Sequence, residues 1–387
     1  MPVPSEVPEI TASDLARALD SGEPVQVVDV RAPARVAAGR IHSVPSARFH
    51  NIVGSQLITK TRVDQTGLDP ALPVTVVCGR GHDSRVLARH LALMGCEARS
   101  LRGGMAAWMT LVVPRDLAPP ASLDRFVQGD RLGKGALGYL LVSEGEGLII
   151  DPPRDVTSYL DAARAARARV VGVADTHVHA DYISGAPALA RALGVPYYLH
   201  PADAVYPYDG TPGRIAFHPV QDGFEIPLGR SRVLVRHTPG HTEGSVTYIV
   251  DGTAVLTGDF VFVASLGRPD LAGRAEAWTP RLWSSVTTAK REWSHEAVIY
   301  PAHYATDQER RDDRTVGGRF GDLLAHNEAL QFGDERRFSE WVLARAASFP
   351  EAYRQIKAIN VGLLTVDDST ADDLEIGRNE CALGGTP

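Results

Sequence analysis

Short apolar runs alternate with segments of helical spacing through most of the chain. The runs that predict buried strands lie at residues 25–31, 74–77, 138–142, 147–151, 170–174 and 254–256. The segments of helical spacing lie at residues 14–20, 85–95 and 155–168, with further pieces at 319–324, 339–347 and 353–359. Strands that alternate with helices predict an α/β architecture.

Length and composition predict a globular chain of two or more domains. The sequence has 387 residues, of which 44% are hydrophobic and 22% are charged. The prolines at 119 and 120 predict a linker between the domains. The expected divisions are an α/β domain over residues 1–115, a linker at 116–124, a second domain over 125–310 and a helical C-terminal extension over 311–387.

Charge and cysteine content limit the partners and the compartment. The net charge of −7, without a dominant basic patch, argues against nucleic acid as the main partner. No apolar run is long enough to span a membrane, and residues 1–6 lack the pattern of a signal peptide. The three cysteines Cys78, Cys96 and Cys381 are too few and too scattered for a disulfide framework. We therefore expect a protein of the reducing cytoplasm.

Two histidines follow the apolar run 170–174, within the sequence THVHAD at 176–181. Residues two apart in an extended backbone point to the same side, so His177 and His179 are expected to share one cleft. A lone histidine more often caps a turn or satisfies a buried hydrogen bond. The spacing of this pair is instead typical of a metal site.

Later segments offer the ligands that such a site still needs. His241 lies in a PGH turn, Asp259 follows the run 254–256 in TGD, and the segment YPAH ends at His303. Imidazole and carboxylate together bind zinc, or ferrous iron when two histidines and one carboxylate occupy one face of the metal. Four such segments in a fixed order favour a metal site over four unrelated structural roles.

These four segments resemble the metallo-β-lactamase superfamily, and the resemblance covers about residues 125–310. It implies an αββα sandwich of two mixed sheets with helices outside and the metal at the sheet edge. Hydrolytic members, including the glyoxalase II thioesterases, use the pattern HxHxDH, whose last histidine helps to hold a second ion. This chain has Tyr182 at that position, and a phenol substitutes poorly for imidazole, which predicts one metal. The alternative is that Tyr182 is a packing aromatic that says nothing about the metal count.

With Tyr182 and the later segment GRPD at 267–270, the pattern resembles the persulfide dioxygenases. The resemblance implies one Fe(II) per chain, held by His177, His241 and Asp259, with open positions for a sulfur ligand and dioxygen and with zinc as the alternative metal. It places further residues around the metal, where they orient ligands or bind substrate: His179, Asp181, Tyr182, Asp270 and His303.

Two more residues are assigned to the catalytic cleft by the same resemblance. Tyr300 is expected to reach the cleft from a late strand end. For Arg268 two roles stay open, because arginine can clamp a substrate carboxylate or pair with the nearby Asp270. Three other histidines are expected to be structural, namely His200, His218 and His237.

Cys78 ends the apolar run 74–77 and begins a glycine-containing loop that leads into the helical segment 85–95. The positive end of that helix should favour a thiolate and an added anionic sulfur at Cys78. The alternative is a buried, inert cysteine, which is what we expect of Cys96. The residues expected to surround the sulfur are Gly79, Arg80, Gly81, His82, Asp83 and Ser84.

The first domain resembles a rhodanese domain over residues 8–115, through VDVR at 28–31, GRI at 39–41, the Cys78 loop and GGMAAW at 103–108. The resemblance implies that Cys78 carries sulfane sulfur as a persulfide. Asp83 stands where many members have a basic residue, which argues against anionic donors such as thiosulfate. A Cys-x5-Arg phosphatase is excluded because Ser84 occupies the arginine position.

Together the two resemblances predict an enzyme that oxidises glutathione persulfide, or a similar small persulfide, with O2 to sulfite and thiol. Cys78 would pass sulfane sulfur to glutathione or join it to sulfite to give thiosulfate. A zinc thioesterase of the glyoxalase II kind and a sulfur-carrier or sensor module are the alternatives. The resemblance also allows a homodimer. Cys381 is expected to be an ordinary tail cysteine rather than a second sulfur carrier, because no basic cluster or following helix activates it.

Overall fold

The computed structural model describes residues 7–383; residues 1–6, for which the sequence predicts no signal peptide, and residues 384–387 lie outside the described part. The chain divides into two compact units. The first comprises Met1–Val113, Arg131–Lys134 and Ile376–Arg378, and the second comprises Pro114–Asp130, Gly135–Glu375 and Asn379–Pro387. Within residues 7–383, none of the helices has the length and apolar character that crossing a bilayer requires.

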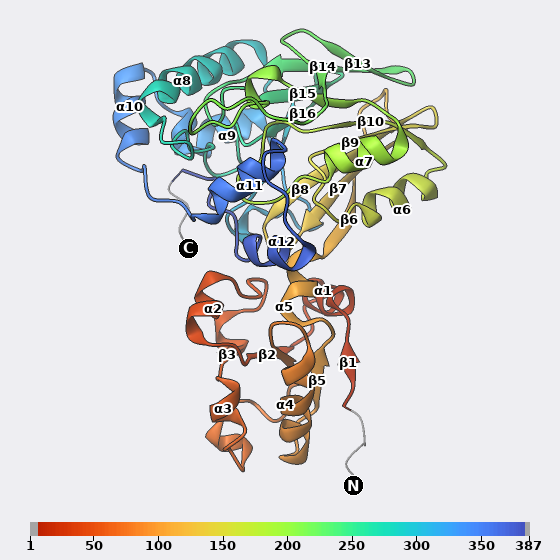
Figure 1. The fold of residues 1–387 in the computed structure, drawn as a ribbon, viewed down its shortest axis with the longest axis vertical. Helices are drawn as coiled ribbons and strands as arrows, with labels where there is room; N and C mark the ends of the chain where they lie inside the picture. The colour runs from red at the N-terminus through yellow and green to blue at the C-terminus, as the bar shows by residue number, and fades with distance from the viewer. Residues whose placement is uncertain (1–6, 384–387) are drawn as a thin grey trace. The chain divides into compact units, whose positions relative to one another are not determined.

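A parallel five-stranded sheet forms the centre of the first unit (Figure 1). Its order is β1-β5-β4-β2-β3, with β1 Glu9–Ile10, β2 Gln26–Asp29, β3 Phe49–Asn51, β4 Val74–Val77 and β5 Ala98–Leu101. The helices are α1 Ala12–Asp20, α2 Pro33–Ala38, α3 Gly54–Leu57, α4 His82–Leu93 and α5 Gly104–Thr110. Because clusters containing Trp108 and Leu87 cover the two faces, every residue of β2 and β4 is buried.

The second unit is built on two mixed sheets. The seven-stranded sheet has the order β12-β11-β10-β9-β8-β7-β6, with β6 Val112–Leu117, β7 Arg125–Arg131, β8 Ala136–Ser143, β9 Glu146–Ile150, β10 Arg169–Ala174, β11 Tyr197–Leu199 and β12 His218–Pro219. The six-stranded sheet has the order β13-β14-β15-β16-β17-β18, with β13 Glu225–Leu228, β14 Ser231–His237, β15 Val246–Val250, β16 Ala254–Gly258, β17 Val298–Pro301 and β18 Gly318–Arg319. Each sheet contains both parallel and antiparallel pairs.

Helices surround the two sheets (Figure 1). They are α6 Thr157–Ala165, α7 Ala186–Leu193, α8 Ala275–Glu292, α9 Phe320–His326, α10 Glu335–Leu343, α11 Ala352–Asn360 and α12 Asp368–Leu374. Of these, α6 and α7 pack on the seven-stranded sheet, whereas α11 and α12 pack on the loop that follows β10. One apolar core lies between the sheets and includes Leu141 and Tyr248, and another joins the six-stranded sheet to α8, α9 and α10 through residues such as Leu282. The predicted αββα sandwich is therefore confirmed.

The segment predicted as a linker, 116–124, begins inside a strand. Residues Val112–Leu117 form β6, the edge strand of the seven-stranded sheet. Pro114 lies within β6, and an edge strand tolerates proline because one side of its backbone has no ladder partner. The extension at 311–387 contains α9–α12, of which α9, α10 and α11 overlap the three expected helical segments and α12 does not correspond to any of them. β18 adds a strand there, and residue 382 bridges Gly267 in an antiparallel arrangement.

Candidate metal centre and cysteine loop

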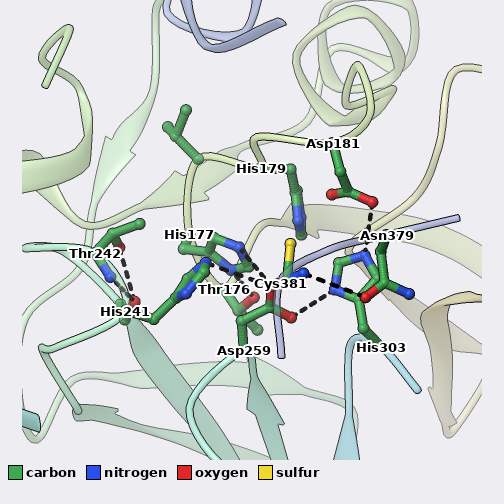
Figure 2. Close-up of polar contacts among 12 residues, drawn as sticks. Thr176, His177, His179, Asp181, His241, Thr242, Asp259, His303, Asn379 and Cys381 are labelled. Carbon is green, nitrogen blue, oxygen red and sulfur yellow. Dashed lines mark hydrogen bonds and ion pairs between the residues drawn. The ribbon is translucent and has the colours of Figure 1, made fainter. Parts of the chain in front are cut away.

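His177, His241 and Asp259 come together at the ends of three strands. His177 follows β10, His241 lies in the turn between β14 and β15, and Asp259 follows β16 (Figure 2). The Asp259 Oδ2 atom lies 3.6 Å from His177 Nε2 and 3.4 Å from His241 Nε2. All three side chains are buried, and these three atoms have no hydrogen-bond partner among residues 7–383. Three buried lone-pair atoms that face one another fit a metal ion, because a cation satisfies all three at once.

The remaining polar atom of each of these side chains is already bonded. His177 Nδ1 lies 2.9 Å from Thr176 Oγ1, and His241 Nδ1 lies 2.9 Å from the carbonyl oxygen of Arg268. Asp259 Oδ1 lies 2.6 Å from His303 Nδ1. Because the backbone carbonyl can only accept, His241 carries its proton on Nδ1 and presents a lone pair on Nε2. Such bonds fix the ring orientation and the tautomer that a metal requires.

Electrostatics keep the three groups in the protonation states that bind metals. Burial, with nearby positive charge, lowers the pKa of His177 well below its ordinary value, and burial lowers the pKa of His241 to about 4. Burial raises the pKa of Asp259, but the neighbouring His303 more than offsets this, so that pKa is lowered. Two neutral imidazoles and one carboxylate therefore face one another at neutral pH.

Thr176 and Asp151 support the site, and the sequence did not indicate a role for either. The Thr176 hydroxyl lies 2.9 Å and 3.1 Å from the two Asp151 carboxylate oxygens, and the Thr176 N–H donates to Asp151 at 2.7 Å. Asp151 follows β9 and has a φ of 53°, which is uncommon for a residue other than glycine. Asp151 thus holds Thr176, and Thr176 in turn holds His177.

His179 and Tyr182 bind each other beside the three metal-facing groups. Their rings stack with centroids 4.2 Å apart, and the Tyr182 hydroxyl lies 2.9 Å from His179 Nε2. The same nitrogen lies 3.1 Å from Asp151 Oδ1. Tyr182 is fully buried, and its hydroxyl also donates to the Asp151 carbonyl oxygen at 3.2 Å. The phenol therefore orients His179 and the adjoining loop.

A second group of possible metal ligands contains Asp181, His303 and Cys381. One ligand atom from each lies within 4.8 Å of the others, and all three side chains are buried (Figure 2). The expectation that Cys381 is an ordinary tail cysteine is therefore wrong. Burial lowers the pKa of His303, but Asp181 and Asp259 raise it to about 10, so His303 carries a proton between these two carboxylates at neutral pH.

Backbone contacts fix the tail that carries Cys381. The Arg268 N–H donates to the Cys381 carbonyl oxygen at 2.9 Å, and the Leu383 N–H donates to Leu266 at 2.9 Å. The Glu380 N–H donates to the Tyr353 hydroxyl at 2.9 Å. These are contacts between segments more than 25 residues apart, which no local pattern in the sequence indicates.

The GRPD segment shapes the site without facing it. Of the two roles left open for Arg268, the structure shows the pairing with Asp270, through bonds of 2.6 Å and 2.7 Å. Arg268 also donates to the backbone oxygens of Ala347 and Glu380. A Cβ atom at Gly267 would lie 1.7 Å from the Asp259 carbonyl oxygen, so this position requires glycine.

The prediction that Tyr300 reaches the catalytic cleft is wrong. Its ring packs in the core between the sheets, 5.1 Å from the Phe126 ring and 6.2 Å from the Tyr139 ring. Three histidines that were expected to be structural lie outside the metal-facing groups. His200 and His237 stack on each other at 4.2 Å, and His218 is exposed on β12.

In the first unit, Cys78 lies between the end of β4 and the start of α4. Its side chain is 4% exposed. The Gly81 N–H donates to the Cys78 sulfur at 3.1 Å, and the Ser84 hydroxyl lies 3.3 Å from the sulfur. Gly81 has a φ of 87°, which lets the backbone turn around the sulfur into the helix. Asp83 is exposed in the first turn of α4.

Comparisons with known proteins agree with this architecture. Residues 134–312 match the metallo-beta-lactamase superfamily, and residues 11–111 match the rhodanese-like domain. The chain therefore contains a metallo-β-lactamase domain and a rhodanese domain. A metallo-beta-lactamase from Staphylococcus aureus subsp. aureus COL, solved as a crystal structure, is similar with a TM-score of 0.55 and 27% identity, covering 63% of this chain and 74% of that one.

Two relatives of this chain have different activities in their names. The human protein named persulfide dioxygenase ETHE1, mitochondrial, is 29% identical over 211 residues, which is 53% of this chain and 72% of that protein. The hydroxyacylglutathione hydrolase of Anaeromyxobacter dehalogenans is 37% identical over 140 residues, which is 35% of this chain and 50% of that protein. Similarity thus supports a metal-dependent enzyme, with an oxygen-using and a hydrolytic relative.

Proposed function

We propose that this protein is a persulfide dioxygenase that oxidises the terminal sulfur of a small thiol persulfide, such as glutathione persulfide, to sulfite. The observation that carries the proposal is the set of two neutral histidines and one carboxylate, His177, His241 and Asp259, with three unpartnered buried atoms facing one another. This ligand set is typical of mononuclear ferrous enzymes that use dioxygen. The similarity to the human persulfide dioxygenase supports the same choice.

The proposed reaction is RSSH + O2 + H2O → RSH + sulfite + two protons. Bound to the three ligands, ferrous iron supplies the redox chemistry through which dioxygen oxidises the sulfur. The chain's own residues position the ligands: Thr176 holds the His177 ring, and His303 holds the Asp259 carboxylate. The buried surroundings exclude bulk water, and this limits hydrolytic side reactions.

The rhodanese domain supplies a second step in this proposal. The Cys78 thiolate, stabilised by the Gly81 N–H and the N-terminus of α4, accepts sulfane sulfur and releases the donor thiol or sulfite. Transfer to glutathione would regenerate Cys78 and yield the persulfide that the metal domain consumes. Transfer to sulfite would yield thiosulfate instead. In the first direction the sulfane sulfur on Cys78 becomes the atom that the metal domain oxidises, and in the second it joins the sulfite that the metal domain releases.

Metal analysis of anaerobically purified protein, together with oxygen uptake on adding glutathione persulfide, tests the proposal. We expect about one iron per chain and prompt uptake. His241→Ala should lose both, whereas the matched control His218→Ala should keep both because His218 is exposed on β12. Cys78→Ser should leave uptake with added glutathione persulfide largely intact. Iron-loaded protein that takes up no oxygen with the persulfide would refute the proposal.

A second candidate is a zinc thioesterase, and Cys381 is the observation that favours it. Tyr182 replaces the usual histidine of a second metal position, but Cys381 brings a thiol to Asp181 and His303 and supplies a third donor. The hydroxyacylglutathione hydrolase relative has this class of activity by name. Two zinc ions per chain, one ion in Cys381→Ala, and hydrolysis of an acyl-glutathione without oxygen would establish this candidate. Absence of hydrolysis in zinc-loaded protein would eliminate it.

A further inference from the structure

Asp203 is a buried carboxylate that binds both of the loops that carry the metal-facing histidines. We call residues 176–184 the first histidine loop and residues 238–245 the second. Asp203 lies in a short 3-10 helix, η3 Pro201–Asp203, which follows β11. Because β10 and β11 are parallel neighbours, the loops after them lie at the same edge of the sheet. This places Asp203 beside the first histidine loop, which follows β10.

Three donors from the two histidine loops use both oxygens of the Asp203 carboxylate. In the first loop, the Val178 N–H donates to Asp203 Oδ2 at 2.7 Å. In the second loop, the Thr242 hydroxyl donates to Oδ2 at 2.8 Å and the Gly244 N–H donates to Oδ1 at 2.7 Å. A Cβ atom at Gly244 would lie 2.8 Å from Asp203 Oδ1, so this close approach requires glycine. Because all three partners donate, an amide in place of the carboxylate would turn an N–H group toward another donor.

Lys357 of α11 binds the other backbone group of Val178. Its side chain is buried, and its amine donates to the Val178 carbonyl oxygen at 3.0 Å. Burial lowers the pKa of Lys357, and the Asp203 carboxylate partly offsets this. Val178 stands between His177 and His179 in the sequence. The one residue between these two histidines therefore has its N–H on a buried carboxylate and its carbonyl oxygen on a buried amine.

The later part of the first histidine loop is bound by Asn360, which lies one turn after Lys357 in α11. The Asn360 amide group donates to the carbonyl oxygens of His179 and Tyr182, at 2.9 Å each, and its oxygen accepts from the Ser184 N–H at 2.9 Å. These three partners all belong to the first histidine loop. Asn360 thus fixes that loop alone, whereas Asp203 ties the first loop to the second.

We propose that Asp203 and Lys357 are positioning residues that hold His177 and His241 at the spacing that one metal ion requires. The two rings have centroids 4.9 Å apart. Asp203 joins the loops that carry them, and Lys357 holds Val178 in place against Asp203. Fixing both loops before the metal arrives reduces the conformational freedom that binding has to remove. The inference rests on the proposed function only in that the metal-facing groups bind a metal ion, and it holds for iron and for zinc.

Zinc titration of the metal-free full chain, in competition with a chelator of known affinity, tests the proposal. Asp203→Asn should weaken zinc binding about tenfold, and Lys357→Met about threefold because Asn360 still holds part of the loop. The matched control is Gln128→Ala. Gln128 is buried and binds both backbone groups of Val316 at 2.8 Å, much as Asp203 and Lys357 bind those of Val178. This control should lower the melting temperature but keep the zinc affinity within about twofold of wild type.

Lys357→Met separates positioning from simple electrostatics. Removing a positive charge near the site would by itself raise the affinity for a cation, and removing a neutral amine would leave it unchanged. Loss of positioning lowers the affinity. Equal or tighter zinc binding by Lys357→Met would therefore overturn the proposal, as would wild-type affinity in Asp203→Asn. Methionine is unbranched like lysine and suits a buried position, so Lys357→Met decides the question if Asp203→Asn does not fold.

The visible absorption of bound Co2+ gives a second measurement, which a loss of stability alone would not change. The bands should shift in Asp203→Asn, because the two histidines no longer keep their spacing, and should match wild type in Gln128→Ala. Unchanged bands in Asp203→Asn would overturn the proposal. Failure of the dioxygenase proposal gives a different result, namely no oxygen uptake by iron-loaded protein whose zinc affinity still responds to Asp203→Asn and Lys357→Met.

Discussion

Thr176→Val should weaken metal binding although Thr176 is not itself a metal ligand. The hydroxyl joins His177 Nδ1, at 2.9 Å, to the Asp151 carboxylate, at 2.9 Å and 3.1 Å. Valine has nearly the same shape as threonine, so it fits against Gly258 as Thr176 does. The two residues are close, because a Cβ atom added at Gly258 would lie 2.5 Å from the Thr176 hydroxyl oxygen. The substitution therefore removes the hydrogen bonds and leaves the packing almost unchanged.

The magnitude follows from the role of the lost bonds. Partners that orient a metal-binding histidine are worth about 10- to 100-fold in metal affinity, which is about 1.4 to 2.7 kcal/mol. Asp151 Oδ1 keeps the Thr176 N–H at 2.7 Å and His179 Nε2 at 3.1 Å, whereas Oδ2 loses the Thr176 hydroxyl. The loss should therefore appear in metal affinity, together with a smaller loss of stability from the unpaired carboxylate oxygen.

Competition with a chelator of known affinity, titrated against metal-free protein, measures this effect. The matched control is Thr238→Val, which removes a buried hydroxyl that bonds Thr247 at 3.0 Å in the loop before His241. That variant should bind metal within about threefold of wild type, because no bond to a ligand is lost. If Thr176→Val also stays within threefold, the hydroxyl does not orient His177 and the reasoning fails.

Three further results are expected. Removing the metal with a chelator should lower the melting temperature of the second unit by about 5–10 °C, since a ligand at 100 times its Kd adds about 2.7 kcal/mol; an unchanged transition in calorimetry would contradict a buried metal site. In metal-free protein the pKa of His303 is raised to about 10 from 6.5, so its stabilising contribution is complete below about pH 6.5 and is lost as the pH rises through about 10. Melting temperatures measured from pH 7 to 10 should therefore fall more for wild type than for His303→Gln, and parallel curves would refute this. Asp83→Lys should lower the KM for thiosulfate in sulfur transfer to cyanide by about fivefold, with Asp64→Lys as an exposed control that should show no change.

The three metal-facing residues could be expected from the sequence because His177 and Asp259 closely follow apolar runs and His241 lies in a Pro/Gly turn of the same motif order. A histidine or an aspartate that follows an apolar run lies at the end of a strand, and therefore at the edge of a sheet. In the metallo-β-lactamase motif order, the four segments bring such side chains together at one edge. Tyr300 shows where this reasoning fails. The run Val298–Pro301 is largely buried, so it has no polar alternation that would tell which face each side chain takes. In the structure Tyr300 pairs in register with Leu256 and faces the core.

Cys381 and Lys357 could not be predicted, because long-range contacts decide their positions. Each lies about 100 residues or more after the last strand-end ligand, Asp259, in a segment whose own pattern indicates only a tail or a helix. Cys381 is held at the site because its segment forms backbone hydrogen bonds with residues 266–268. Lys357 is held there because its ammonium group donates a hydrogen bond to the Val178 carbonyl oxygen. The positions of such buried polar groups depend on tertiary contacts, so the hydrophobic periodicity of the local sequence does not indicate them.

The position of Cys381 bears directly on whether one metal or two is bound. A second ion would need the lone pair of His303 Nε2, which lies 3.1 Å from Asp181 Oδ2. Asp181 and Asp259 raise the pKa of His303, so His303 keeps its proton at pH 7 and a second ion must displace that proton. His177 and His241 need no such step, because burial keeps both neutral. We therefore expect the first metal ion to bind His177, His241 and Asp259. A second ion would bind only if its binding free energy, including the bond to the Cys381 sulfur, exceeds the stabilisation that the His303 proton gives.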